Sequence, residues 1–390
     1  MEFMFSNKVK DMKPSAIREI FKSLSDPNVI SFAAGNPSPL SFPVEKMKDV
    51  ADEIFATQAS VAFQYGITEG YPRLREQIKT RLRERFNTGT DDDELIITTG
   101  GQQGIDLCAK VLCNEGDTVI CENPSFIGAL NAFRSYNTNL VGVDLEDDGI
   151  NIEALENALK ANPNTKIIYV IPTFQNPAGI TTSLEKRKAI LDLAKKYNVL
   201  ILEDNPYGEL RFAGEDVPTI KSLDTDGRVL YCSSFSKILS AGMRIGFVCG
   251  PKELVQKIVV VKQVNDVHTN QFFQMVASKF IDKYGLDEHI DFIRGLYRDK
   301  CNLMLSELDK QVGDKARYTR PEGGLFIWLT VDGANGDELA KRAIENKVAV
   351  VTGSSFNPIQ GGYSPSIRLN YSTPSDEQII EGVKRLASIL

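Results

Sequence analysis

A lysine, an arginine and two serines lie close together in the stretch SSFSKILSAGMRIGF, residues 233–247. Ser234 and Ser236 precede Lys237, and Arg244 follows within the same stretch. Two hydroxyls, an ammonium and a guanidinium that converge would suit a phosphate dianion, because an arginine fork can bind two phosphate oxygens at once. The alternative is structural: a lysine whose stem covers apolar surface at a strand end, and an arginine in a surface ion pair.

Polar side chains also follow three other apolar runs that are expected to be strands. The segment TTGGQQG, residues 98–104, would place the amides of Gly101 and Gln102 at a helix N-terminus, which is a site for anions. Asn176 follows the run KIIYVI, and Asp204 and Tyr207 follow the run NVLIL. The carboxyl ends of parallel strands are where open α/β sheets bind ligands. Taken singly, each segment could equally be a turn or a helix cap.

Histidine and cysteine offer little further chemistry. The six cysteines form no C-x-x-C pair, so we expect free buried thiols and no metal site. The two histidines, His268 and His289, fall in a polar loop and a charged helical segment. A histidine general base is therefore not expected.

Composition favours a small metabolite as the binding partner. The chain has 390 residues, 42% of them apolar and 25% charged, with a formal net charge of −7. Lysines and arginines are spread along the chain, so we expect neither nucleic acid nor a membrane surface as a partner. The N-terminus lacks a signal-peptide core, and no apolar run approaches the ~18 residues of a membrane span. We expect a cytoplasmic protein.

Short apolar strands alternate with amphipathic helices through much of the chain. The expected strands are ELIITT at 94, DTVIC at 117, KIIYVI at 166, NVLILED at 198, RVLYCSS at 228 and RIGFVC at 244. Such runs predict a mostly parallel sheet with helices on both faces, because each strand is buried on both sides. One of these helices is expected over 183–197, with Thr182 and Glu185 as its capping box.

The pattern changes near residue 285, which predicts more than one domain. Residues 46–285 carry the strand–helix alternation of a large, ligand-binding α/β domain. Residues 286–390 begin with a long charged helical segment and continue with alternating strands such as GGLFIWLTV and SIRLNYS, as in a smaller α+β domain. Residues 1–45 lack the alternation and are expected to form an arm that packs with the smaller domain.

Together, TTGGQQG, NPAG, EDNPYGELRF, SSFSKILSAGMRIGF and SIRLNYS resemble the fold-type I aminotransferases of class I/II, which depend on pyridoxal 5'-phosphate (PLP). The likeness is greatest to the aminoadipate/kynurenine and multisubstrate aromatic branch, and it extends from AAGNP at 33 to SIRLNYS at 366. The resemblance implies a mostly parallel seven-stranded sheet with a smaller α+β domain. It also implies a homodimer with active sites at the subunit interface.

The resemblance also implies how the cofactor is held. Lys237 would bind the cofactor aldehyde as a Schiff base, and its pKa should be lowered by burial beside an arginine. Asp204 would keep the pyridine nitrogen protonated, so that the ring can accept electrons. The remaining contacts would be Asn176 and Tyr207 to the phenolic oxygen, Phe126 against the ring face, and Gly101, Gln102, Ser234, Ser236 and Arg244 to the phosphate.

Substrate contacts follow from the same resemblance. Arg368 would bind the substrate α-carboxylate, with Gly35, Asn36 and Asn176 lining the pocket. Tyr65 would reach the phosphate of the neighbouring subunit; alternatively, it is a half-buried loop residue. Arg18, on the expected arm, would meet an acidic substrate side chain or else lie in solvent.

The implied reaction is a ping-pong transfer of an amino group from an amino acid to a 2-oxo acid, with 2-oxoglutarate as the expected acceptor. A lyase or decarboxylase that uses the same cofactor remains an alternative, because a fold does not choose which bond breaks. A ligand-sensing regulator with this scaffold would add a DNA-binding domain, and no helix-turn-helix precedes residue 46. Two departures from the family pattern are Gly101, where relatives often have serine, and Phe126, where many have tyrosine.

Overall fold

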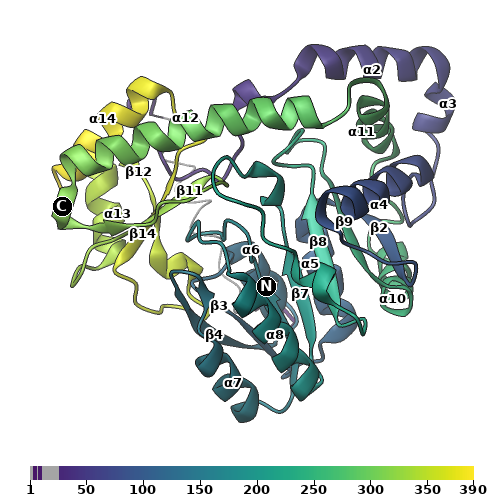
Figure 1. Ribbon diagram of the computed structural model, residues 1–390, viewed down its shortest axis with the longest axis horizontal. Helices are drawn as coiled ribbons and strands as arrows, with labels where there is room; N and C mark the ends of the chain where they lie inside the picture. The colour runs from purple at the N-terminus through teal and green to yellow at the C-terminus, as the bar shows by residue number, and fades with distance from the viewer. Residues whose placement is uncertain (1–2, 7, 11–25) are drawn as a thin grey trace.

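The computed structural model describes residues 3–6, 8–10 and 26–390, and a large mixed sheet forms its centre (Figure 1). The strand order is β2-β9-β8-β7-β6-β3-β4-β5. The five adjacent strands β8, β7, β6, β3 and β4 run parallel to one another. The resemblance implied seven strands, and the eighth is the two-residue β5, which pairs antiparallel with β4. The strands are β2 Asp93–Thr99, β3 Thr118–Asn123, β4 Asn139–Glu146, β5 Gly149–Ile150, β6 Thr165–Val170, β7 Leu200–Asp204, β8 Val229–Ser234 and β9 Ile245–Pro251.

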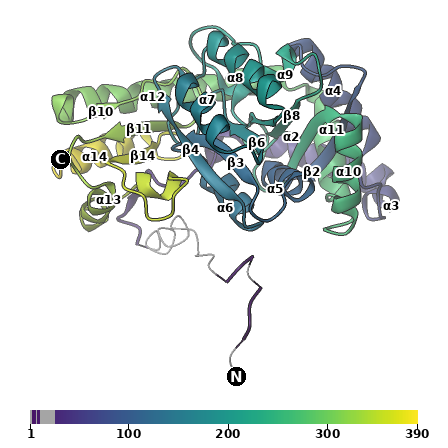
Figure 2. The same ribbon diagram turned by 90° about the horizontal axis from the view of Figure 1, so that it is seen from below.

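Helices cover both faces of this sheet, as Figure 2 shows. On one side lie α5 Gly100–Leu112, α6 Ile127–Arg134 and α10 Lys252–Gln263, and on the other lie α7 Ile152–Ala161, α8 Leu184–Tyr197 and α9 Ile220–Leu223. Strand β6 explains why both faces are apolar: Ile167 and Tyr169 join the cluster with α5, whereas Ile168 and Val170 join the cluster with α7 and α8. Successive side chains of a strand point to opposite faces, so a doubly covered strand must be apolar throughout.

Helix α8 begins one residue later than the predicted capping box requires. Its N-cap is Ser183, whose hydroxyl accepts a 3.4 Å hydrogen bond from the amide of Lys186. Thr182, the predicted cap, is buried against Gly149 instead. The helix ends at Tyr197, and its C-cap is Asn198, whose φ of 52° is a left-handed conformation that asparagine tolerates well.

A second, antiparallel sheet has the strand order β10-β11-β14-β13. Its strands are β10 Arg317–Tyr318, β11 Phe326–Thr330, β13 Val351–Thr352 and β14 Ser366–Asn370. The short strand β1, Ile30–Ser31, pairs in parallel with β12, Val348–Ala349. This pairing joins the beginning of the continuous described range, residues 26–390, to the part of the chain that forms the second sheet. The domain boundaries at 45 and 285 stay a prediction.

Long helices join the two sheets. Helix α12, Asp287–Gln311, runs from the vicinity of α11, Gln271–Tyr284, to α14, Asp376–Ala387, against which it packs (Figure 1). The remaining helices of ten residues or more in the described part of the chain are α2 Val44–Thr57, α4 Pro72–Phe86 and α13 Gly336–Glu345. Among the described residues, no helix combines the length and apolar character needed to cross a bilayer.

Candidate active site

The structure brings the Gly-Gly turn and the SSFSK loop together. Strand β8 ends at Ser234, whose hydroxyl lies 2.7 Å from that of Ser236 and accepts the amide of Ser236 at 2.9 Å. Arg244 donates from Nη1 to the hydroxyl of Ser236 and from Nη2 to the carbonyl of Thr99, both at 3.4 Å. Helix α5 begins at Gly100, so the amides of Gly101 and Gln102 lie in its first turn. Two hydroxyls, a guanidinium and a helix N-terminus therefore surround one point.

The backbone around this point is unusual. Arg244 has a φ of 56°, and Gly100 has a φ of 74°. A Cβ on Gly100 would also lie 2.7 Å from Cζ of Arg244, so glycine is required there. At Gly101, by contrast, an added Cβ would lie 3.8 Å from Cβ of Ser234, which is an ordinary van der Waals distance. A serine at this position would therefore fit, whereas Gly101 offers only a backbone donor.

Lys237 lies beside this cluster and next to the N-terminal segment. Its Nζ donates a 2.7 Å hydrogen bond to the carbonyl of Gly35. Burial lowers the pKa of Lys237 to about 8, and the positive charges of Arg368 and Arg244 act in the same direction. The direction of this pKa shift and its main cause, burial beside an arginine, agree with the prediction. A larger fraction of this amine is therefore neutral and nucleophilic near neutral pH than for a lysine of ordinary pKa.

Asp204 is the last residue of β7 and is 4% exposed. Burial raises its pKa to about 7, against the hydrogen bond from Tyr169, which acts to lower the pKa. The hydroxyl of Tyr169 on β6 donates to Oδ2 of Asp204 at 2.8 Å. Sequence reasoning did not identify Tyr169, although one tyrosine in the otherwise aliphatic run KIIYVI was an available signal.

A third group of side chains joins residues from distant parts of the chain. Asn176 donates from Nδ2 to the hydroxyl of Tyr207 at 3.4 Å and accepts from Nη1 of Arg368 at 2.9 Å. Nη2 of Arg368 donates to the carbonyl of Ala33 at 2.7 Å. Thus the turn after β6, the end of β7, strand β14 and the N-terminal segment meet here.

Arg368 itself is 2% exposed and lies between two aromatic rings. The guanidinium carbon is 4.2 Å from the ring centre of Phe326 and 5.0 Å from that of Phe356. Burial lowers the pKa of Arg368 to about 10, which still leaves it a cation at neutral pH. Its Nε–H has no acceptor among the described residues. A buried cation with an unused donor is suited to binding a carboxylate.

A buried arginine supports the turn that carries Asn176. Arg187 of α8 is 0% exposed and donates to the carbonyls of Pro172 at 2.6 Å and Thr182 at 2.9 Å, at the two ends of this turn. It also donates to the hydroxyl of Thr173 at 3.0 Å. Sequence reasoning missed this residue, because an arginine in an amphipathic helix is ordinarily exposed.

The remaining predicted site residues lie at the margins. Phe126 is the half-buried N-cap of α6, and Asn36 is exposed, with its carbonyl accepting from the hydroxyl of Ser372 at 2.8 Å. Tyr65 is 81% exposed and packs edge-on against the ring of His268, with 5.8 Å between ring centres. Arg18 lies outside the described residues.

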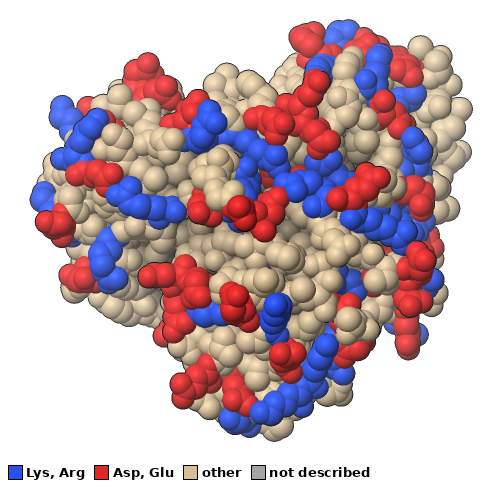
Figure 3. All heavy atoms as spheres, in the orientation of Figure 1, with Lys and Arg blue, Asp and Glu red and all other residues tan. Residues whose placement is uncertain are grey.

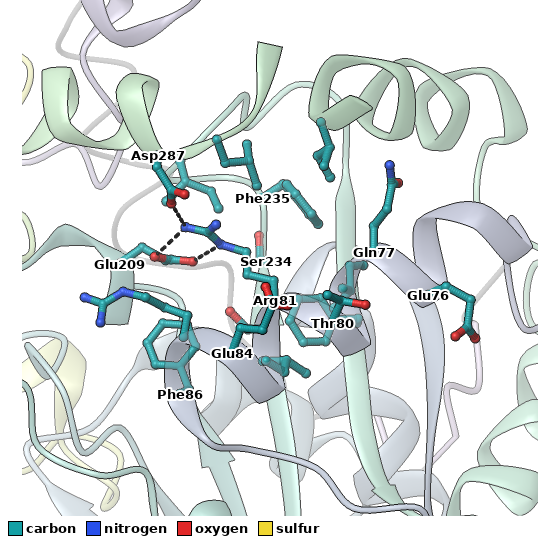
Figure 4. A pocket seen from close by; sticks show the side chains of 18 of the residues that line it. Glu76, Gln77, Thr80, Arg81, Glu84, Phe86, Glu209, Ser234, Phe235 and Asp287 are labelled. Carbon is teal, nitrogen blue, oxygen red and sulfur yellow. Dashed lines mark hydrogen bonds and ion pairs between the residues drawn. The ribbon is translucent and has the colours of Figure 1, made fainter. Parts of the chain in front are cut away.

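A cavity of about 530 Å³ adjoins the site behind the end of β8, and Figure 4 shows its lining. Arg81 lies in it with both sides of its guanidinium occupied, by Glu209 at 2.6 Å and by Asp287 at 2.9 Å. Because this arginine is already paired, the cavity does not offer it to a phosphate. The cluster around Arg244 is the better anion site.

Charged side chains of both signs are mixed on the face of the molecule shown in Figure 3. Basic side chains that cross its middle lie beside acidic ones. Arg73 pairs with Asp282, and Arg317 pairs with Asp332, each at 2.6 Å. Exposed pairs of this kind contribute little to stability.

Comparison with known proteins identifies the family. The model for aminotransferase class I and II matches residues 27–386. The chain belongs to this family. It is 39% identical to aromatic-amino-acid aminotransferase 1 of Thermococcus litoralis over all of this chain and 94% of that protein. The aminotransferase activity predicted from the motifs is thereby confirmed.

Two solved structures show the same fold over nearly the whole chain. One is the Pyrococcus horikoshii kynurenine aminotransferase in complex with PMP, with a TM-score of 0.95 and 39% identity, covering 98% of this chain and 96% of that one. The other is the α-aminoadipate aminotransferase of Thermus thermophilus, in complex with a phosphopyridoxyl-leucine, with a TM-score of 0.90, 36% identity and the same coverage. This aminotransferase therefore lies in the predicted branch of the family.

Proposed function

We propose that this aminotransferase moves the amino group of aromatic, kynurenine-like or 2-aminoadipate donors to 2-oxoglutarate by a ping-pong mechanism. The enzyme uses PLP as its cofactor, which supplies an aldehyde for the amino group and a ring that takes up electrons. The observation that carries the proposal is the convergence of Lys237 and Arg368 on the segment 33–35. Ala33 accepts from Arg368, and Gly35 accepts from Lys237.

The residues present fit this cofactor. The phosphate suits the cluster of Ser234, Ser236 and Arg244 with the amides of Gly101 and Gln102. The pyridine nitrogen suits the carboxylate of Asp204, and the phenolic oxygen suits Asn176 and Tyr207. Phe126, at the start of α6, would contact the ring face as an apolar surface without the hydroxyl that many relatives have.

Each side chain then has a defined task. Lys237, whose pKa is about 8, would hold the cofactor aldehyde through its neutral amine and, when free, would move the proton at the substrate Cα. Asp204 would favour a protonated ring nitrogen. Arg368 orients the donor through its α-carboxylate, which fixes the direction of the Cα–H bond.

The choice of donors rests on the relatives, whose names specify aromatic amino acids, kynurenine and 2-aminoadipate. Gly35 and Asn36 would line the donor pocket beside Arg368. We also propose that Arg18 meets an acidic donor side chain. The arm, large domain and small domain would divide at residues 45 and 285, so that the pocket lies where the segments meet.

We further propose that two copies form a dimer, with Tyr65 reaching the phosphate of the partner. Phe63 is 71% exposed and stacks with Phe55 and Phe272, at 5.9 and 6.4 Å between ring centres. Val264, the C-cap of α10, is 78% exposed. Exposed aromatic clusters of this kind are typical of protein–protein interfaces. A Phe63→Glu variant should sediment as a monomer, whereas an unchanged mass would refute this interface. A cytoplasmic location is also a prediction.

The experiment that tests the function is a panel of amino acids with 2-oxoglutarate. We expect glutamate to form with aromatic, kynurenine-like or 2-aminoadipate donors, and Lys237→Ala to abolish turnover. Without an acceptor, a transaminase converts its cofactor stoichiometrically to pyridoxamine phosphate, as absorbance shows. Continuous release of a 2-oxo acid and ammonia without an acceptor would instead indicate the lyase, and continuous release of carbon dioxide would indicate the decarboxylase.

A further inference from the structure

A polar cluster lies next to the turn that begins α5, with Lys262 buried and with Gln103 and Asp266 partly buried. Lys262 of α10 donates from Nζ to Oε1 of Gln103 at 2.7 Å and to the two oxygens of Asp266 at 2.8 and 2.9 Å. Gln103 in turn donates from Nε2 to Oδ2 of Asp266 at 2.7 Å. The Lys262 side chain is 0% exposed. All three side chains are thus held by one another in a fixed arrangement.

Thr99 connects this cluster to the proposed phosphate site. Its amide donates to Oε1 of Gln103 at 2.7 Å, and its hydroxyl donates to Oδ2 of Asp266 at 3.0 Å. On the other side, its carbonyl accepts from Nη2 of Arg244. Thr99 is the N-cap of α5, yet its hydroxyl makes no capping bond to the helix. The hydroxyl is instead committed to the cluster.

Apolar packing is enough to explain why helix α5 is stable, so the polar cluster is not needed to hold the helix in place. The helix buries Ile105, Leu107 and Cys108 in the main apolar core. A buried lysine–carboxylate pair is commonly no more stabilising than apolar side chains of similar size, because both charges lose their water. The cluster therefore contributes precise placement rather than bulk stability.

We propose that Gln103, Lys262 and Asp266 are positioning residues that fix the turn Thr99–Gly101 in the geometry that binds the cofactor phosphate. The inference rests on the proposed function and adds residues to it. The three side chains act through Thr99, which sets where the amides of Gly101 and Gln102 point and where the Arg244 fork lies. Hydrogen bonds to a phosphate depend on such alignment, so a small displacement of the turn lowers affinity for the phosphate group itself.

The test compares pyridoxamine 5'-phosphate with pyridoxamine, which lacks the phosphate. Neither forms a covalent bond to Lys237. The dissociation constant of pyridoxamine divided by that of pyridoxamine 5'-phosphate, called the ratio below, therefore isolates the contribution of the phosphate. The ratio is measured by calorimetry on the full-length protein freed of cofactor. We expect Gln103→Leu to lower this ratio about tenfold, because the variant binds pyridoxamine 5'-phosphate more weakly. Pyridoxamine affinity should be unchanged.

Two further variants and one control variant test whether the effect on the ratio depends on Thr99. Thr99→Val removes only the hydroxyl that reaches Asp266 and should lower the ratio in the same direction, whereas Thr99→Ser should restore it. Gln77→Leu is the matched control: Gln77 is a half-buried glutamine that donates to Asp282 at 2.8 Å and to the carbonyl of Ser278 at 3.1 Å, away from the turn. It should leave the ratio unchanged.

Each other outcome contradicts the inference. An unchanged ratio in Gln103→Leu would show that the cluster does not position the turn. Equal weakening of both ligands would indicate a general packing role. If the unaltered protein itself shows no preference for the phosphorylated ligand, the proposed phosphate site is wrong and the inference falls with it.

Discussion

The hydroxyl of Tyr169 donates a 2.8 Å hydrogen bond to Oδ2 of Asp204, and both side chains are buried. This bond stabilises the carboxylate against burial, which acts to raise its pKa. Tyr169→Phe keeps the ring, which packs edge-on against Phe133, and removes only the donor. We expect the pKa of Asp204 in the cofactor-free protein to rise above about 7 and turnover at neutral pH to fall about tenfold.

The pKa can be followed by carbon NMR of carboxyl-labelled aspartate, with Asp204→Asn to assign the signal. Tyr231→Phe is the matched control, because Tyr231 is equally buried and accepts a 3.0 Å hydrogen bond from neutral Asn205. An unchanged Asp204 pKa in Tyr169→Phe would mean that the contact does not tune the carboxyl.

The lowered pKa of Lys237 gives a prediction for pH dependence. Only the neutral amine attacks the cofactor aldehyde, so the rate of PLP attachment should rise about tenfold per pH unit and level off above about 8. A lysine with its usual pKa would continue to gain rate to about pH 10.5. Stopped-flow absorbance of the cofactor-free protein measures this profile.

Arg368→Met should move that profile to higher pH, because it removes a positive charge that lowers the pKa of Lys237. Arg317→Met, which alters only an exposed pair with Asp332, should not move it. A plateau at the same pH in both variants would assign the shift to burial and Arg244 rather than to Arg368.

Arg368→Lys keeps the charge but loses the planar fork. We expect kcat/KM for amino acid donors to fall about a hundredfold, because a bidentate contact is replaced by a single one. The affinity for pyridoxamine 5'-phosphate should change little, since the phosphate cluster is built from other residues. Steady-state kinetics with phenylalanine and glutamate, beside calorimetry, would separate the two effects. Equal losses in both measurements would point to a folding defect.

Arg187 should matter for stability rather than for chemistry. Arg187→Met removes a buried donor from the carbonyls of Thr182 and Pro172, although Pro172 keeps the amide of Thr182 at 2.8 Å. We therefore expect the free energy of unfolding to fall by about 3 kcal/mol. Urea unfolding of the cofactor-free protein measures this change, with Arg317→Met as the exposed control. A loss no greater than that of the control would show that the turn does not depend on Arg187.

Arg18→Ala should raise KM for dicarboxylic donors such as 2-aminoadipate, by an amount that corresponds to about 1.5–3 kcal/mol of lost charge-assisted bonding. Aromatic donors should be little affected, because Arg368 still binds their α-carboxylate. Kinetics with both donor classes check this. Equal losses for both classes would indicate a folding role for the arm, and no loss for either would place Arg18 outside the site.

The sequence by itself determined the strands and the chemistry. The run KIIYVI predicts a strand buried on both faces because its apolar residues are consecutive, and β6 is that strand. The order of Ser234, Ser236, Lys237 and Arg244 within one short loop predicts a phosphate cluster, because residues so close in sequence can meet without help from the rest of the fold.

Only the tertiary structure decided which partners complete the site. Tyr169 and Asp204 are 35 residues apart, and Gln103 and Lys262 are 159 apart, so each contact exists only because two elements pack side by side. The N-cap of α8 is a smaller case: Thr182 and Ser183 both carry a capping hydroxyl, and the packing of Thr182 against Gly149 leaves Ser183 to cap the helix. Local pattern fixes which residues can do chemistry, whereas long-range packing fixes the hydrogen bonds and burial that set their pKa values.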